Sequence, residues 1–282
     1  MNSQPQTKVV NVVEKLHGVN VKDPYRWLEG DAKEVKNWIN EQNRYTDSFL
    51  NKVEQREKIE RRLKELFKTG STGIPVPAKS KYFFTERKGN EDMGTLYVKE
   101  GLNGKSKALI DQTKFSKDGS ASLTFWKPTE DGKLLAYGIS QSTNDKQSMH
   151  ILEVESCKNL QEDIPSDQYP FNFEWLPDKS GFYYSRAPLD VKKGEELFHH
   201  KIYLHKFGED YKKDKLIFGK DLAKEHFPHA TITEDGKYLC VKVAIFEKDG
   251  ERTEIYLKDL SNKSGFNFIK VSGEVKAEFL VK

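Results

Sequence analysis

The histidines are the residues whose type and spacing come closest to a chemical site. They are His199, His200 and His205 in one short run, and His226 and His229 three positions apart. Closely spaced histidines can bind zinc, but a zinc site also needs further Cys, His or carboxylate ligands in a cluster, and none accompanies these. Pro228 also disrupts the helix that would place the last two on one face. We therefore expect no metal site.

Motifs of the common catalytic and cofactor sites are missing from the 282 residues. The sequence has no Gly-x-Ser-x-Gly elbow, no His-Glu-x-x-His pair, no glycine-rich phosphate loop and no Asp-rich calcium loop. Serines are abundant, but none has a base at a diagnostic spacing, and catalytic triads assemble from distant positions. We expect no cofactor and name no catalytic residue. Local motifs alone indicate a binding or scaffolding unit.

The charge pattern argues against nucleic-acid and membrane partners. Lys and Arg number 47 and Asp and Glu 44, giving a net charge of +3, and the two signs alternate along the chain. A nucleic-acid surface needs clustered positive charge instead. No stretch approaches the ~18 apolar residues of a membrane helix, and the first residues lack the apolar core of a secretory signal. We expect a cytoplasmic protein.

The cysteine and aromatic content indicates which kind of secondary structure must position any site. Cys157 and Cys240 stand 83 positions apart, too few to staple a secreted fold and too isolated to bind zinc. We expect both to be buried, reduced thiols. Aromatic residues make up 12% of the chain, with 17 Phe and 12 Tyr. Because aromatic side chains suit pleated, half-buried surfaces, the chain should be mostly strand.

The first seventy residues depart from this expectation and predict two amphipathic helices. Asp31 and Glu34 have the spacing of a capping box, and Gly70 is placed to end the second helix. The apolar stripes are Val35, Trp38, Ile39, Tyr45, Phe49 and Leu50, then Ile59, Leu63, Leu66 and Phe67. Two such helices bury little against each other. Either they form a hairpin packed on the next domain, or the stripes belong to a larger body elsewhere.

From residue 73 onward the sequence repeats with a period near fifty. Four similar segments centre on Leu96, Met149, Ile202 and Ile255, each 53 positions from the next. A turn and a strand precede each segment. Taking Tyr82, Leu134, Phe182 and Tyr238 as the equivalent positions in these strands, the intervals are 52, 48 and 56. Asp-Gly turns in the second and fourth units tolerate positive φ and so help to set register.

This period predicts a β-propeller, whose blades are four-stranded sheets packed around an axis. A β-sandwich would give turns every 8–12 residues without the longer period. We therefore predict a mainly β protein: an N-terminal helical segment at residues 1–72 and about four propeller blades at residues 73–282. We interpret Trp126 and Trp175, just before two of the turns, as blade packing rather than ligand platforms.

Several segments carry a resemblance to the prolyl oligopeptidase family. They are DPYRWLE at residues 23–29, WINEQN at 38–43, the run at 118–138, WLPD at 175–178, GFYYSR at 181–186, HKIYLH at 200–205 and DGKYL at 235–239. The run at 23–29 is similar to the family's N-terminal helical signature, and the later segments resemble its propeller. The resemblance spans residues 9 to 260.

The resemblance implies a serine endopeptidase that cleaves short proline-containing peptides, with an α/β-hydrolase domain capped by a seven-bladed propeller. In that family the N-terminal helical segment joins the hydrolase domain, and the catalytic Ser, Asp and His lie in the C-terminal part. No catalytic residue can therefore be assigned here. The family also lends a propeller aromatic to the substrate pocket near residues 169–173, which makes Phe171 and Phe173 the substrate-proximal candidates. Strand core explains both equally well.

Three functional hypotheses follow. The first is an N-terminal part of such a peptidase, without the catalytic domain and inactive alone, with self-association through exposed propeller edges. The second is a free-standing four-bladed propeller that binds peptides or proteins. The third is a split enzyme, complemented in trans by a chain that carries the remaining blades and the hydrolase domain.

Overall fold

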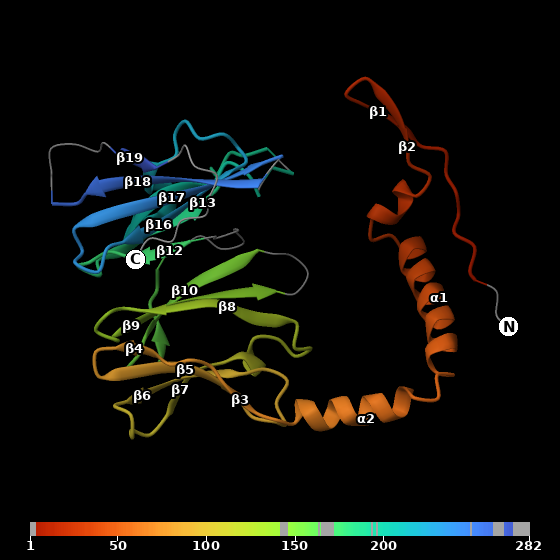
Figure 1. Cartoon of the computed structure of the whole chain (residues 1–282), viewed down its shortest axis with the longest axis horizontal. Helices are drawn as coiled ribbons and strands as arrows, with labels where there is room; N and C mark the ends of the chain where they lie inside the picture. Colours follow the sequence, from red (N-terminus) through yellow and green to blue (C-terminus); the bar gives the residue numbers. More distant parts are fainter. Residues whose placement is uncertain are drawn as a thin grey trace. The chain divides into compact units, whose positions relative to one another are not determined.

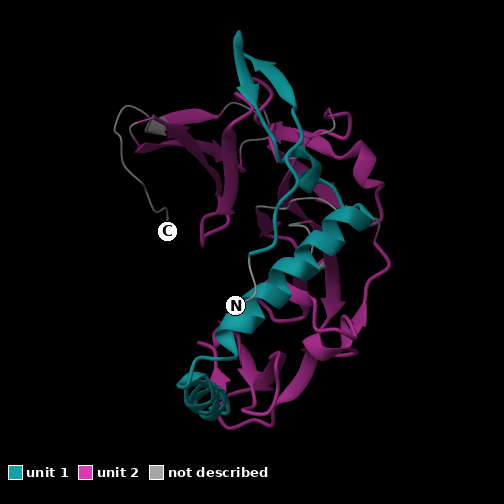
Figure 2. Cartoon of the chain, turned by 90° about the vertical axis from the view of Figure 1, so that its right-hand side faces the viewer, with its two compact units in different colours: residues 1–69 teal, residues 70–282 magenta. Residues whose placement is uncertain are grey.

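The computed structural model divides the chain into two compact units, Met1–Thr69 and Gly70–Lys282 (Figure 2). It describes residues 4–141, 146–162, 164, 172–192, 194–195, 197–248, 250–261 and 268–272. No helix within these ranges is both long and apolar enough to cross a membrane.

Unit 1 opens with a hairpin that the sequence pattern did not predict. Its elements are β1 (Val13–Leu16), β2 (Val19–Lys22), the 3-10 helix η1 (Arg26–Glu29), α1 (Lys33–Leu50) and α2 (Arg56–Phe67). His17 and Gly18, both at positive φ, form the two-residue turn between β1 and β2. Arg26 anchors the hairpin to the following helix, because its guanidinium pairs with Asp23 at 2.6 Å and with Glu14 at 2.8 Å.

The predicted capping box of the first helix is wrong. Ala32 occupies the N-cap position of α1 and makes no side-chain cap, while Glu34 pairs with Lys8 at 2.9 Å. The apolar stripes do form, since α1 and α2 cover most of the predicted helical residues. The indole rings of Trp27 and Trp38 meet edge to face at 6.4 Å.

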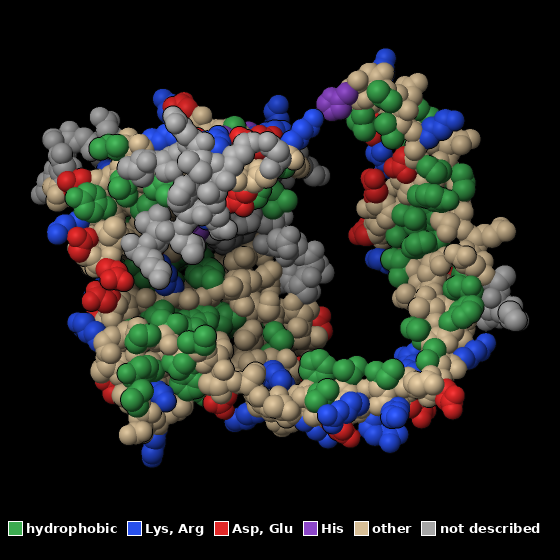
Figure 3. Space-filling model, viewed as in Figure 1, with side chains coloured by type: hydrophobic (Ala, Val, Ile, Leu, Met, Phe, Trp, Pro, Cys, Tyr) green, Lys and Arg blue, Asp and Glu red, His purple; other side chains and the backbone are tan. Residues whose placement is uncertain are grey.

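These stripes are largely exposed. Val35 is the buried residue of α1, and α2 has none. Figure 3 shows apolar side chains gathered along both helices. The most exposed are Phe49 at 55%, Ile59 at 56%, Leu66 at 51% and Phe67 at 68%. Such contiguous apolar surface is typical of a face that packs against another body.

The described part of unit 2 folds as four antiparallel sheets, which we call blades 1 to 4 (Figure 1). Blade 1 holds β3 (Ser71–Thr72), β4 (Val76–Ala78), β5 (Lys81–Arg87), β6 (Thr95–Glu100) and β7 (Lys107–Asp111), and blade 2 holds β8 (Ala121–Pro128), β9 (Leu134–Gln141), β10 (Gln147–Glu153) and β11 (Lys158–Asn159). Blade 3 holds β12 (Phe173–Trp175), β13 (Gly181–Arg186), β14 (Lys201–Lys206) and β15 (Lys215–Phe218), and blade 4 holds β16 (His226–Ile232), β17 (Tyr238–Glu247), β18 (Gly250–Asp259) and β19 (Ile269–Ser272). Short 3-10 turns, η2 (Gln112–Lys114) and η3 (Tyr211–Lys213), connect strands.

Strand order follows the chain in every blade, with β3 and β4 sharing the first edge of blade 1. The four repeated segments are the third strands β6, β10, β14 and β18, and their upstream partners are β5, β9, β13 and β17. The predicted partial propeller with its helical leader is therefore confirmed. The period could be read in the sequence because each blade repeats the same strand–turn–strand pattern.

Three apolar clusters hold successive blades together. Phe83, Leu96 and Leu135 lie in the cluster between blades 1 and 2, which also takes up part of Trp126. The second cluster, between blades 2 and 3, contains Trp175, and a third lies between blades 3 and 4. Both tryptophans thus belong to blade packing, as predicted. Stacking is necessary because one thin sheet cannot bury both of its faces.

The two cysteines differ in their surroundings. Both are free thiols. Cys240 is 2% exposed in β17, and burial raises the pKa of its thiol. Cys157 is only half-buried, because it sits at φ 54° in the turn between β10 and β11. The expectation of burial is therefore wrong for Cys157, since the tight turn places it at the surface.

Candidate functional site

The first strands of blades 2, 3 and 4 lie next to one another and are joined by polar contacts. The ammonium of Lys127 in β8 lies 2.7 Å from a carboxylate oxygen of Glu174 in β12. The indole Nε1 of Trp175 donates to the main-chain carbonyl of Lys127 at 3.1 Å. We call these edges the inner strands, because the edges that approach one another across blades are those nearest a propeller axis.

Asn172 makes the corresponding link from blade 3 to blade 4. Its side-chain amide donates to the carbonyl of Ala230 at 2.9 Å and accepts from the amide of the same residue at 2.7 Å. The nitrogen of that side chain also lies 3.2 Å from Nε2 of His229. Asn172 is 6% exposed, so this two-way bond satisfies a side chain that would be costly to bury unpaired.

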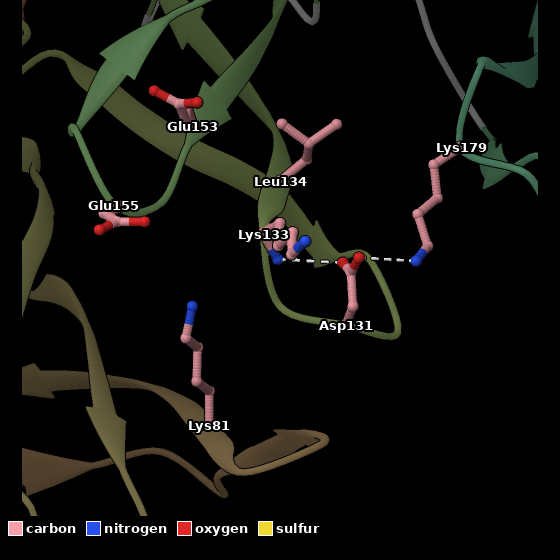
Figure 4. Close-up of a pocket in the computed structure, with 7 residues that line it drawn as sticks. All are labelled: Lys81, Asp131, Lys133, Leu134, Glu153, Glu155 and Lys179. Carbon is pink, nitrogen blue, oxygen red and sulfur yellow. Dashed lines mark hydrogen bonds and ion pairs between the residues drawn. The ribbon is translucent and has the colours of Figure 1, made fainter.

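The turns between first and second strands form a second row of contacts, which we call the rim turns: residues 79–80, 129–133, 176–180 and 233–237. Lys179 of blade 3 reaches Asp131 of blade 2 at 2.6 Å (Figure 4). From the other side, the ammonium of Lys81 donates to the carbonyl of Gly132 at 3.1 Å. The rim turn of blade 2 is thus held by both of its neighbours.

In the described part of the chain, the rim turns border at least two pockets. The smaller, of about 450 Å³, is shown in Figure 4, and its described lining includes Lys81, Asp131, Glu153 and Lys179. The larger, of about 650 Å³, lies where the rim turns of blades 2, 3 and 4 meet the ends of β8, β12 and β16. We call it the rim pocket and take it as the candidate functional site.

The rim pocket combines apolar surface with charged side chains of both signs. Its apolar lining comes from Pro128, Trp175, Leu176, Pro177 and Ile232, and its charged lining from Lys127, Lys179, Glu130, Glu174, Glu234 and Asp235. Among the described lining residues there is no serine, cysteine or histidine. A mixed surface of this kind can bind an extended polar chain with some apolar groups, but these residues include no usual nucleophile–base pair.

Burial sets the ionisation of the inner strands. It raises the pKa of Glu174, and the nearby charge of Lys127 opposes that rise. Partial desolvation lowers the pKa of His229, although the residue is exposed, and the positive charges of Lys127 and Lys242 lower it further. A neutral imidazole suits the contact of its Nε2 with the side-chain amide of Asn172.

Asp131 shows the opposite balance. Burial by itself raises the pKa of this carboxyl, but hydrogen bonds from Lys179, from the Thr129 hydroxyl and from the Lys133 amide outweigh it, so the pKa lies well below its usual value. The carboxylate of Asp131 in this rim turn therefore stays ionised and keeps its hydrogen-bond donors.

Of the two substrate-proximal candidates, Phe171 lies outside the described residues and Phe173 lies within them. Phe173 is 7% exposed in β12, and its ring packs against Phe125, Trp175 and Phe182 in the core between blades 2 and 3. It is absent from the described lining of the rim pocket.

The contacts between blades were not found by sequence reasoning, although a signal was present. Lys179 and Asp131 are 48 positions apart, the same interval that separates Leu134 from Phe182 in the repeat. Side chains of opposite charge that lie one repeat apart in the sequence occupy equivalent positions in adjacent blades. Among the described residues, no group of three or more His, Cys, Asp or Glu side chains could hold a metal ion.

The sheet order, the inner strands and the rim turns define a β-propeller domain preceded by a helical segment. The chain belongs to the prolyl oligopeptidase family: the family model described as the prolyl oligopeptidase N-terminal β-propeller domain matches residues 5–282.

Among curated relatives, the chain is 33% identical over 268 residues to a prolyl endopeptidase of Elizabethkingia meningoseptica, covering 93% of this chain and 37% of the relative. It is 24% identical over 287 residues to a dual function macrocyclase-peptidase of Galerina marginata, covering 93% of this chain and 39% of that protein. The chain thus spans less than two fifths of the length of these relatives.

Solved structures show the same fold. One, from a study of two prolyl endopeptidases, aligns with a TM-score of 0.83 at 31% identity, covering 97% of this chain and 40% of the other. Prolyl oligopeptidase B of Galerina marginata, bound to a 25mer macrocyclization substrate, aligns with a TM-score of 0.78 at 20% identity, covering 97% and 42%.

Proposed function

We propose that this chain is the propeller part of a prolyl oligopeptidase-type serine endopeptidase, and that it controls the access of short proline-containing peptides to a catalytic domain. The rim pocket carries the proposal. It lies at the ends of the inner strands of three blades, its volume suits a short peptide segment, and its described lining has no usual nucleophile–base pair. Cleavage of a peptide bound at this place would therefore need catalytic residues from another domain.

Unit 1 supports the same proposal. Its helices expose Phe49, Ile59 and Phe67, each more than half accessible. In the proposed enzyme this surface packs against the catalytic domain, and burial of about 100 Å² of apolar surface is worth roughly 2.5 kcal/mol. The leader would then link the propeller to the domain whose access it controls.

A chimera tests the proposal. In the Elizabethkingia meningoseptica prolyl endopeptidase, the part that aligns with this chain is replaced by this chain, and cleavage is measured on a proline-containing octapeptide and on a long unfolded protein. We expect the octapeptide to be cleaved and the long substrate to be excluded. A folded chimera that cleaves both equally well, or neither, contradicts the proposal.

A pocket-filling variant makes the test specific to the site. Glu234 is exposed and lines the rim pocket, so Glu234→Trp in the chimera should lower kcat/KM for the octapeptide several-fold. Lys237→Trp is the matched control, because Lys237 is exposed in the same turn but is absent from the pocket's described lining. Equal effects of the two variants would show that the pocket has no role.

The same pocket favours a second candidate, a propeller that binds peptides without a catalytic domain. The discriminating measurement is calorimetric titration of the chain alone with proline-containing peptides. Binding by the chain alone that Glu234→Trp abolishes, together with an inactive folded chimera, favours the binding module.

A further inference from the structure

Carboxylates outnumber ammonium groups in the described lining of the rim pocket. The charged side chains there are Lys127 and Lys179 against Glu130, Glu174, Glu234 and Asp235. Both ammonium groups are already paired, because Lys127 lies 2.7 Å from Glu174 and Lys179 lies 2.6 Å from Asp131. The two lysines therefore leave an excess of negative charge in this lining.

Two of these carboxylates have no cationic partner. Asp235 contacts the ammonium of Lys237 in its own turn at 3.2 Å. Glu130 and Glu234 are exposed, and neither forms an ion pair with any side chain in the part of the chain that the structure describes. Glu130 lies on blade 2, and the blades on both sides of it are described. Neither of the blades adjacent to Glu130 therefore supplies it with a cation.

The two unpaired carboxylates occupy the same place in two identical turns. Residues 129–133 and 233–237 both read Thr-Glu-Asp-Gly-Lys. In each turn the threonine hydroxyl donates to Oδ1 of the aspartate, at 2.8 Å and 2.7 Å, and the lysine amide donates to the same oxygen at 3.1 Å. Because these bonds fix both turns alike, Glu130 and Glu234 stand at equivalent positions on the two blades that flank blade 3.

The same pocket offers apolar surface to a ligand. Trp175, Leu176, Pro177 and Ile232 line it. The bond from the Trp175 indole to the main-chain carbonyl of Lys127 fixes the ring. Carboxylates beside apolar surface suit a basic side chain, because its aliphatic stem covers the apolar groups while its charged head reaches the carboxylates.

Glu174 favours the same kind of ligand. Its side chain lines the pocket and is 11% exposed. Burial raises its pKa even though Lys127 lies beside it, so the lysine compensates its negative charge only in part. A second cation in the pocket would compensate that charge further.

We propose that the rim pocket selects peptides that carry a basic side chain, with the charged head at Glu130 and Glu234 and the aliphatic stem against the apolar lining. The inference rests on the proposed function, because it names the class of peptide that the rim pocket admits. An acidic side chain at the same place should be disfavoured, since it would meet unpaired carboxylates.

Calorimetric titration of the full chain with proline-containing octapeptides tests the proposal. The peptides carry arginine, glutamine or glutamate at one position, which is moved in turn along the peptide, and both termini are blocked so that only this side chain changes charge. At one position or more, the arginine peptide should bind about fivefold more tightly than the glutamine peptide, and the glutamate peptide most weakly. High salt should reduce the preference, because the two carboxylates are exposed.

A double variant assigns the preference to the two carboxylates. Glu130→Gln with Glu234→Gln keeps the size of both side chains and should abolish the preference for arginine over glutamine. Glu209→Gln with Glu225→Gln is the matched control, because it changes the net charge equally at two exposed residues that are absent from the described lining. No binding of any peptide, no preference at any position, or an equal loss in both double variants overturns the proposal.

The chimera separates this inference from the function on which it rests. The readout is the ratio of kcat/KM for the arginine peptide to that for the glutamate peptide, with and without the changes at Glu130 and Glu234. An active chimera that excludes the long protein but shows the same ratio in both forms retains the proposed function and overturns the charge selection. A chimera that fails the size test overturns the access control, and binding of arginine peptides by the chain alone then still supports the charge selection.

Discussion

The ammonium of Lys127 lies 2.7 Å from a carboxylate oxygen of Glu174, and this ion pair joins the inner strands of blades 2 and 3 beside the rim pocket. The two side chains are 41% and 11% exposed, so the carboxylate is the more costly partner to bury. The pair places opposite charges at the pocket and itself adds no net charge to it. Its strength determines how the junction between these blades responds to pH.

Glu174→Gln should leave stability at pH 7 within about 1 kcal/mol of the parent protein, because burial already opposes the charge. The pKa of Glu174 is raised above its usual 4.5, so the folded state binds the extra proton and stability falls as pH rises through that window. The Glu174→Gln variant has no carboxyl to titrate at this position, so it does not show this fall in stability. Its stability relative to the parent should therefore increase between about pH 4 and pH 7, as measured by urea unfolding.

Lys127→Met is the complementary change. It removes the charge that opposes the rise in the pKa of Glu174, so we expect a loss of about 1–2 kcal/mol at pH 7. The loss should shrink near pH 4, where Glu174 is protonated in both proteins. A loss independent of pH would show that Lys127 contributes packing rather than charge.

Asp131→Asn should destabilise the chain by about 1 kcal/mol at pH 7, because it weakens the contact with Lys179. The folded pKa of Asp131 is lowered, so its stabilisation is present above the usual value of 3.8 and is lost as pH falls below it. Asp235→Asn is the matched control, with the same bonds inside its turn and no lysine from another described blade. Equal losses in the two variants would contradict the contact between blades.

Gly181→Ala should cost about 2–4 kcal/mol, because the added Cβ would lie 2.0 Å from the main-chain oxygen of His205 on β14. Neither backbone can move without breaking the pairing of β13 with β14. Gly30→Ala is the control, since nothing lies within 4 Å of its added Cβ. Thermal unfolding of both variants measures the difference.

A buried network in blade 3 gives a further prediction. Asp214 accepts a hydrogen bond from the Tyr184 hydroxyl at 2.8 Å and lies 3.0 Å from Nδ1 of His205, which is fully buried. Asp214→Ala should cost about 3 kcal/mol, because it leaves two buried groups without this partner, and Tyr184→Phe about 1–2 kcal/mol. Asp210→Ala, which removes only the cap of η3, should cost about 1 kcal/mol.

Leu63→Lys with Phe67→Lys on α2 should reduce the binding of an apolar dye without lowering stability, because these side chains are 47% and 68% exposed. Arg61→Lys on the same helix is the control.

The sequence by itself determined the features that depend on local pattern. The stripe that includes Ile59 and Leu63 predicted a helix because helical neighbours recur every three to four residues. The period that links Leu96 to Met149 predicted blades because each blade repeats one local design. The capping box at Asp31 failed because the helix begins one residue later, with Ala32 at the N-cap position and no side-chain cap. Localisation in the cytoplasm stays a prediction.

Only the tertiary structure decided which side chains meet across blades. Lys127 and Glu174, and likewise Asn172 and Ala230, are separated by nearly one repeat, so no local pattern pairs them. Alternation along a strand tells which residues share a face, but not which face turns toward the axis and which toward the next blade. Phe173 illustrates this: its strand was predicted, whereas its place in the core between blades 2 and 3 depended on how the sheets stack.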